Sequence, residues 1–118
     1  MSIAKKMQVP AGSKIRLLNP PKGFVIDAPI SGKRDEDAVL LFVPNSKDLK
    51  ILGGAVVEAA RRDRLAWIAY PKGGKLETDL NRDKLRELME PLGIQPVRLV
   101  SLDDTWSAMR FRPRSVHH

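Results

Sequence analysis

The sequence contains no cysteine, and its only two histidines, His117 and His118, stand at its C-terminal end. The lack of cysteine excludes a disulfide framework, a thiolate zinc site and a cysteine nucleophile. The lack of an internal imidazole leaves no residue for a Ser-His-Asp triad. The two histidines are either a natural end or the remnant of an affinity tag, so they carry no information about the fold. We therefore expect no catalytic residues, no metal ligands and no cofactor, and the sequence favours a protein that is not an enzyme.

Long apolar segments and aromatic residues are also scarce. The longest apolar run, 38–43, is far shorter than the roughly 20 residues that cross a bilayer. The basic pair Lys5-Lys6 is not followed by an apolar run, as it would be in a signal peptide. Aromatic residues make up 5% of the chain, which is low for a surface that stacks on bases. We expect a cytoplasmic protein without membrane contact.

The chain has an excess of positive charge and an ordinary share of apolar residues. Its 118 residues are 42% hydrophobic and 30% charged. Such a length and composition suit one globular domain, since a domain typically has roughly 100–200 residues. The 21 lysines and arginines exceed the 14 acidic residues by 7, so the net charge is +7. This excess suits an anionic partner, although basic charge also simply favours solubility.

Apolar patterning predicts strands that alternate with helices. The expected strands are 14–18, 38–43, 65–70, 97–102 and 105–112. One helix is expected from an N-cap at Ser46 through Arg62, and a second begins after Thr78 or Asn81 and ends at Pro91 and Gly93. The segment 24–37 has no clean period and predicts at most a short helical turn.

This order of elements predicts an α/β fold with a mostly parallel sheet of about five strands. The short turn at Asp103-Asp104 joins the last two strands into an antiparallel hairpin. Residues 1–12 lack periodicity, so we interpret them as a loose N-terminal arm that folding does not require. The single domain then covers 13–112, and 113–118 form a C-terminal tail.

Several blocks in order resemble a family of small uncharacterised bacterial proteins, a domain of unknown function. The blocks are Leu17–Phe24, Val39–Val43, Trp67–Gly73 with Thr78–Leu80, and Asp103–Ala108. This family is similar to the class I methyltransferase fold, and the resemblance implies a truncated Rossmann-like sheet that has lost two strands. With the expected strands lettered a to e along the chain, the implied spatial order is a-b-c-e-d. The family has no known activity, so the resemblance implies a fold and little function.

The cofactor site of the methyltransferases has no counterpart here. Those enzymes hold their cofactor with a glycine-rich loop after the first strand, where this chain has Asn19-Pro20-Pro21-Lys22-Gly23. Proline removes backbone donors, and the strand that carries the ribose-binding acid is missing. Both points argue against S-adenosylmethionine. The segment Gly73-Gly74-Lys75 is not a phosphate-binding loop, because Leu76 follows the lysine and the earlier glycine is absent.

A rim of charged loops is the candidate site. Ligands of open α/β sheets bind outside the carboxyl ends of the strands. The candidate residues of this C-terminal rim are Lys22, Lys47, Lys72, Gly73, Gly74, Lys75, Asp103, Asp104 and Trp106. They form either an anion site, assisted by the helix start near Ser46, or a set of solvated loop charges and Lys–Asp pairs. Trp106 is either a core residue or a ring that stacks on a ligand.

The expected function is thus a non-catalytic α/β domain that binds a small anion or a protein partner at the rim. The alternative is a weak, sequence-independent nucleic-acid binder. It rests on three basic clusters, Lys5-Lys6, Arg61-Arg62-Arg64 and Arg110-Arg112-Arg114. A second alternative, a methyltransferase-like enzyme, requires a cofactor loop that the sequence does not show.

Overall fold

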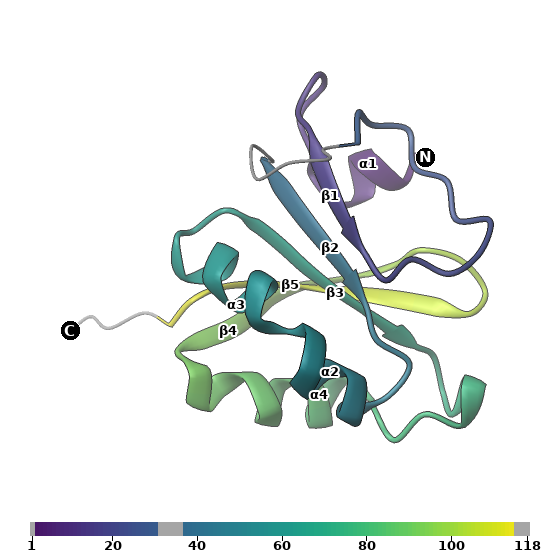
Figure 1. Ribbon diagram of the computed structural model, residues 1–118, viewed down its shortest axis with the longest axis vertical. Coiled ribbons are helices and arrows are strands. Elements are labelled where there is room, and N and C mark those ends of the chain that lie inside the picture. Colours follow the sequence, from purple (N-terminus) through teal and green to yellow (C-terminus); the bar gives the residue numbers. More distant parts are fainter. Residues whose placement is uncertain (1, 31–36, 115–118) are drawn as a thin grey trace.

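A five-stranded mixed sheet organises the computed structural model, which describes residues 2–30 and 37–114 (Figure 1). The strands are β1 (Ile15–Leu18), β2 (Ala38–Phe42), β3 (Leu65–Pro71), β4 (Ile94–Ser101) and β5 (Trp106–Pro113). Their spatial order is β1-β2-β3-β5-β4. The strands β1, β2 and β3 are parallel, and β5 is antiparallel to both β3 and β4. The predicted α/β class and strand order are confirmed.

The central strands are buried on both faces, as their continuous apolar sequences predicted. Every residue of β2 is buried, and so is every residue of β3 after Leu65. Successive side chains of a strand point to opposite faces. Leu40 and Trp67 therefore lie in one core layer, and Leu41 and Ile68 lie in the other.

Three helices cover one face of the sheet. They are α2 (Ser46–Leu52), α3 (Gly54–Arg61) and α4 (Arg82–Met89). The predicted helix 46–62 is interrupted at Gly53, where a Cβ atom would stand 2.7 Å from the carbonyl oxygen of Leu49. Asn45, rather than Ser46, is the N-cap of α2, and Asn81 rather than Thr78 is the N-cap of α4.

The fourth strand begins three residues earlier than predicted. The short helical turn η2 (Glu90–Leu92) ends at Gly93, whose φ of +87° favours glycine, and β4 follows at once with the buried Ile94. Pro96 and a register shift between Pro96 and Arg98 interrupt the alternation there, which explains why the pattern alone placed the start too late.

The other face of the sheet is covered by the N-terminal segment, which is not a loose arm. It contains the helix α1 (Ile3–Lys6), and Ala4, Met7 and Val9 are buried against the layer that holds Trp67. A four-residue helix is too short for a periodic signal, so the sequence pattern missed it. The α/β domain therefore includes this segment.

The connection between β1 and β2 also packs on this second face, through residues such as Phe24 and Ile26. Residues 24–30 contain no helix, and Ile30 forms an isolated bridge with Ile15. The rest of the predicted helical turn, 31–36, lies outside the described residues. Pro113 belongs to β5 rather than to a tail, and 115–118 also lie outside the described residues. In the described part of the chain, no helix is long and apolar enough to cross a membrane.

Candidate anion-binding surface

Part of the predicted rim does come together, at the contact between two loops. The ammonium group of Lys72 donates to the Ser101 hydroxyl at 2.5 Å, and that of Lys75 donates to the Asp104 carbonyl oxygen at 2.6 Å. The backbone N–H of Lys72 donates to the Thr105 carbonyl oxygen at 2.8 Å. These bonds join the loop after β3, which contains the short turn η1 (Lys75–Glu77), to the β4–β5 turn.

Asp103 and Trp106, two of the predicted rim residues, both have partners within the fold. One carboxylate oxygen of Asp103 accepts from the backbone N–H groups of Thr105 and Trp106, both at 2.8 Å, so Asp103 closes the β4–β5 turn. Trp106 is 7% exposed and packs edge-on against Phe42, with ring centroids 5.1 Å apart. Of the two interpretations of Trp106, the core position is the one in the structure.

The start of α2 already holds an anion of the protein itself. One carboxylate oxygen of Asp79 accepts from the Ser46 backbone N–H at 2.9 Å, and the other accepts from the Ser46 hydroxyl. These two bonds, the hydroxyl first, hold the pKa of Asp79 below its usual value. Lys22 is exposed in the loop after β1, and Lys47 is exposed in the first turn of α2. Neither takes part in the described hydrogen bonds that join Lys72 and Lys75 to the β4–β5 turn.

We expect the Asp79→Asn variant to have a lower melting temperature than the natural chain at neutral pH. The folded-state pKa of Asp79 is depressed, so its stabilising contribution is present above its ordinary pKa of about 3.8 and is lost as the pH falls through the folded value. The difference in melting temperature should therefore shrink in acid. Asp104→Asn removes the same charge from an exposed turn and is the control. If the melting temperatures of Asp79→Asn and the natural chain differ by the same amount at neutral and at acid pH, the assigned role of Asp79 is contradicted.

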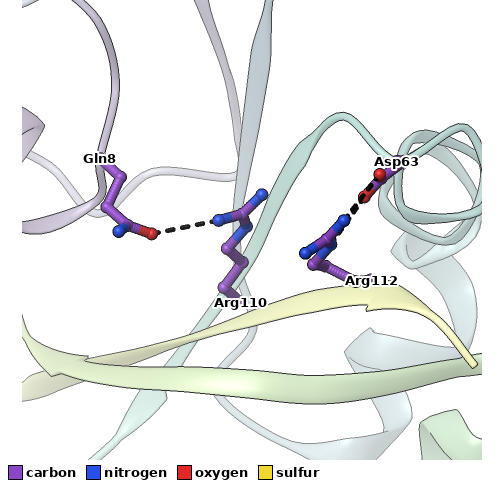
Figure 2. Close-up of polar contacts among 4 residues, drawn as sticks. All are labelled: Gln8, Asp63, Arg110 and Arg112. Atoms are coloured by element: carbon purple, nitrogen blue, oxygen red, sulfur yellow. Dashed lines mark hydrogen bonds and ion pairs between the residues drawn. The ribbon is translucent and has the colours of Figure 1, made fainter. Parts of the chain in front are cut away.

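At the opposite end of the sheet, an ion pair joins β5 to the turn between α3 and β3. Two guanidinium nitrogens of Arg112, Nε and Nη2, donate to the two carboxylate oxygens of Asp63, each at 2.8 Å (Figure 2). This two-bond geometry is the strong form of an arginine–carboxylate pair. It keeps the pKa of Asp63 below its usual value. The pair places Arg62 and Arg64, which flank Asp63 in sequence, near the arginines of β5.

Arg110 lies next to this pair, and its hydrogen-bond partner among the described residues is a neutral side chain (Figure 2). Its Nη1 donates to the side-chain oxygen of Gln8 at 3.1 Å. Burial is the main cause that lowers the pKa of Arg110, and the positive charges of Arg112 and Arg98 lower it further. The carboxylate of Asp63 acts in the opposite direction and raises this pKa. An arginine titrates so far above neutrality that Arg110 stays charged. It is a partly buried cation among like charges.

A hollow extends the basic region toward β1. It has a volume of about 310 Å³ and is lined by Arg16, Arg62, Arg64 and the carboxylate of Glu58, among others. Glu58 is 3.0 Å from Arg62 in an ion pair on α3. We call the whole set the arginine surface, and it consists of Arg16, Arg62, Arg64, Arg98, Arg110 and Arg112. It wraps around the amino ends of the parallel strands, because Arg16 pairs with Val39 on the helix-covered face and Arg110 pairs with Trp67 on the other face. With Glu58 and Asp63 included, the six cations and two anions give 6 − 2 = +4.

Sequence reasoning found only part of this surface. It singled out Arg62, Arg64, Arg110 and Arg112 as members of two separate clusters, and it did not connect them. Arg98 joins because it lies directly opposite Arg110 in the β4–β5 pairing, a register that the bulge conceals. Two other members of the predicted clusters lie elsewhere. The Arg61 guanidinium donates to the Leu92 carbonyl oxygen, and the Lys6 ammonium donates to that of Ser101.

No protein-family model, curated protein or solved structure matches the chain. The fold and the surface define an α/β domain with a basic region at the amino ends of its parallel strands.

Proposed function

We propose that this protein is a non-catalytic domain that binds the backbone of a nucleic acid through the arginine surface, without sequence preference. The observation that carries the proposal is the Arg112–Asp63 ion pair, because it unites two basic clusters that are far apart in sequence. Guanidinium groups match the oxygens of a phosphate with several N–H donors in one plane. A net charge of +7 attracts a polyanion from a distance.

The burial of the aromatic residues argues that phosphates rather than bases are contacted. Five of the six aromatic side chains belong to the buried core, namely Phe42, Trp67, Tyr70, Trp106 and Phe111. The sixth, Phe24, packs edge-on against Phe42. Proteins that prefer single strands stack the bases on exposed aromatic rings. We therefore expect a duplex to bind at least as well as a single strand of the same length.

Removal of two arginines should reduce the salt dependence of duplex binding. In the variant Arg62→Ala/Arg64→Ala, we expect weaker binding at every salt concentration. We also expect the slope of log K against log [salt] to become less steep by about 1 to 2, since each phosphate contact contributes roughly 0.9. The measurement is fluorescence anisotropy of a labelled duplex in a salt series.

The matched control is Lys72→Ala/Lys75→Ala, which removes the same charge from the rim. Its slope should stay within experimental error of the natural chain's slope. Equal losses in the two variants would show that net charge alone drives the binding, and they would contradict the assignment to the arginine surface.

The second candidate is a small anion or a protein partner at the rim. The observation in its favour is that Lys72 and Lys75 lie together at the β4–β5 turn, with both ammonium groups exposed. This candidate predicts that inorganic phosphate shifts the NMR amide signals of Lys22, Lys47 and Gly73-Gly74 together. The arginine surface should then show no comparable response.

A relationship to the class I methyltransferase fold is a further part of the proposal. The strand order and the antiparallel β5 support a sheet derived from that fold by the loss of two strands. The loop after β1 retains Pro20 and Pro21 at the place of the cofactor loop, and neither has a backbone N–H to offer. Methyl transfer is therefore not part of the proposed function.

A further inference from the structure

Gln8 has a backbone conformation that favours glycine. The N–H of Gln8 donates to the Lys5 carbonyl oxygen and that of Val9 to the Ala4 carbonyl oxygen, both at 3.0 Å, which is the Schellman pattern that ends a helix. Gln8 occupies its left-handed position, with a φ of +61°. A glutamine in this conformation is strained relative to glycine, which suggests that its side chain has a role that glycine could not fill. That side chain is the partner of Arg110.

The surroundings of Arg110 contain more positive charge than the protein neutralises. Trp67 of β3 and Arg98 of β4 lie directly opposite it on the two neighbouring strands. Arg112 follows two residues later on the same face of β5. Asp63 is the carboxylate that acts on Arg110, and both of its oxygens are already engaged by Arg112. The neutral amide of Gln8 therefore stands beside a cation that an anion would suit better.

Two buried N–H donors in this row have no acceptor among the described atoms. They are Nε of Arg110 and the indole Nε1 of Trp67. Trp67 is fully buried, and a buried donor without a partner costs stability. The two residues form a cross-strand pair, so their side chains leave the same face of the sheet. An oxyanion at this point would offer oxygens to Arg110 and also to Arg98.

We propose that Arg110 is the anchor for a single phosphate group, and that the Gln8 side chain is a neutral placeholder which the phosphate displaces. A tetrahedral phosphate has enough oxygens to accept from Arg110 and Arg98 at once. A carboxylate has two oxygens, and one arginine can occupy both, as Arg112 does at Asp63. The inference rests on the proposed function only for the source of the phosphate, a nucleic-acid backbone rather than the free ion.

Displacement of Gln8 requires no rearrangement of the core. The residue is exposed, whereas its neighbours Met7 and Val9 are buried and hold the backbone against the sheet. Rotation of the Gln8 side chain therefore opens the Nη1 side of Arg110 and leaves the N-terminal segment in place.

The test is an NMR titration with inorganic phosphate against sodium chloride of equal ionic strength. The reporters are the Nε–H signal of Arg110 and the indole signal of Trp67, which a Trp106→Phe variant distinguishes from the only other indole. We expect both signals to shift in a saturable manner. Shifts that rise without saturation and spread evenly over Arg62, Arg64 and Arg112 would overturn the anchor.

Variants of Gln8 supply the sharper comparison. Gln8→Glu places a carboxylate on Arg110 and should weaken phosphate binding by about tenfold or more, because a charge-assisted bond is stronger than a neutral one. Gln8→Ala removes the placeholder and should bind phosphate at least as tightly as the natural chain. Both changes are at an exposed residue, and unchanged backbone spectra verify the fold. Equal phosphate affinity in Gln8→Glu and the natural chain would overturn the inference.

A labelled duplex, tested in parallel, separates this inference from the proposed function. If Gln8→Glu weakens both phosphate and duplex binding, the ligand of the anchor is a backbone phosphate. If phosphate binds saturably and the duplex does not bind, the anchor stands with the free ion as its ligand and the proposed function is wrong. If Gln8→Glu leaves duplex and phosphate binding unchanged while Arg62→Ala/Arg64→Ala weakens duplex binding, the proposed function stands and the anchor is wrong.

Discussion

Replacement of Trp67 by alanine is expected to destabilise the protein by about 3–5 kcal/mol, the usual cost of truncating a large core aromatic residue. Trp67 is fully buried in the layer between the sheet and the N-terminal segment, opposite Leu40 of β2. Truncation to alanine leaves a cavity between the N-terminal segment and the hydrogen-bonded strands β2, β3 and β5. The measurement is urea denaturation followed by circular dichroism.

Two further variants make this expectation testable even if Trp67→Ala does not fold. Trp67→Phe keeps most of the apolar volume and removes a buried N–H that lacks an acceptor, so it should fold and lose clearly less stability. Lys72→Ala breaks one exposed bond to Ser101 and should change the free energy of unfolding by about 0.5 kcal/mol or less. A loss at Lys72 equal to that at Trp67 would contradict the burial of β3.

The sheet was predictable because its signals are local and strong. The apolar runs at 38–43 and 65–70 are bounded by turn residues and are too short to form helices. In the structure they form β2 and β3. Right-handed crossovers and the hairpin at Asp103-Asp104 then leave few arrangements. The observed strand order is the one that the resemblance to the methyltransferase-like family implied.

The basic surface was not predictable as a surface, because it depends on register and on a single ion pair. Nothing local in the sequence indicates that Asp63 would bind Arg112, 49 positions along the chain. The charged residues of the rim loops pointed instead to the carboxyl ends of the strands. There, Asp79, Ser101 and the Asp104 carbonyl oxygen already accept bonds from nearby donors.

The N-terminal segment shows the same limit of local patterns. Its buried side chains Ala4, Met7 and Val9 are spaced too irregularly for a strand, and the four-residue helix α1 contains only the first of them. The burial of these residues is a tertiary effect, because they cover a face of the sheet that a crossover helix covers in larger α/β folds.

A chain that begins at Ser13 is therefore expected to lose its fold or its solubility, contrary to the expectation from the sequence pattern. Removal of the segment exposes the layer around Trp67 and deletes three buried side chains. It also deletes the bond from the Ala4 N–H to the Asp27 carboxylate. Burial of one Val or Met side chain stabilises by about 1.5–3 kcal/mol. The total lost approaches the 5–15 kcal/mol that is typical of a whole domain.

A point variant checks the same argument without removing the segment. Met7 is fully buried, so Met7→Ala should lower the free energy of unfolding by about 2–5 kcal/mol. Lys5→Ala, two residues away on the exposed side of α1, is the matched control and should stay within about 0.5 kcal/mol of the natural chain. Both are measured by urea denaturation, and the shortened chain by the dispersion of its NMR amide signals. If the shortened chain melts within a few degrees of the natural one and Met7→Ala matches Lys5→Ala, the segment contributes nothing to the fold, and Gln8 has no fixed place beside Arg110.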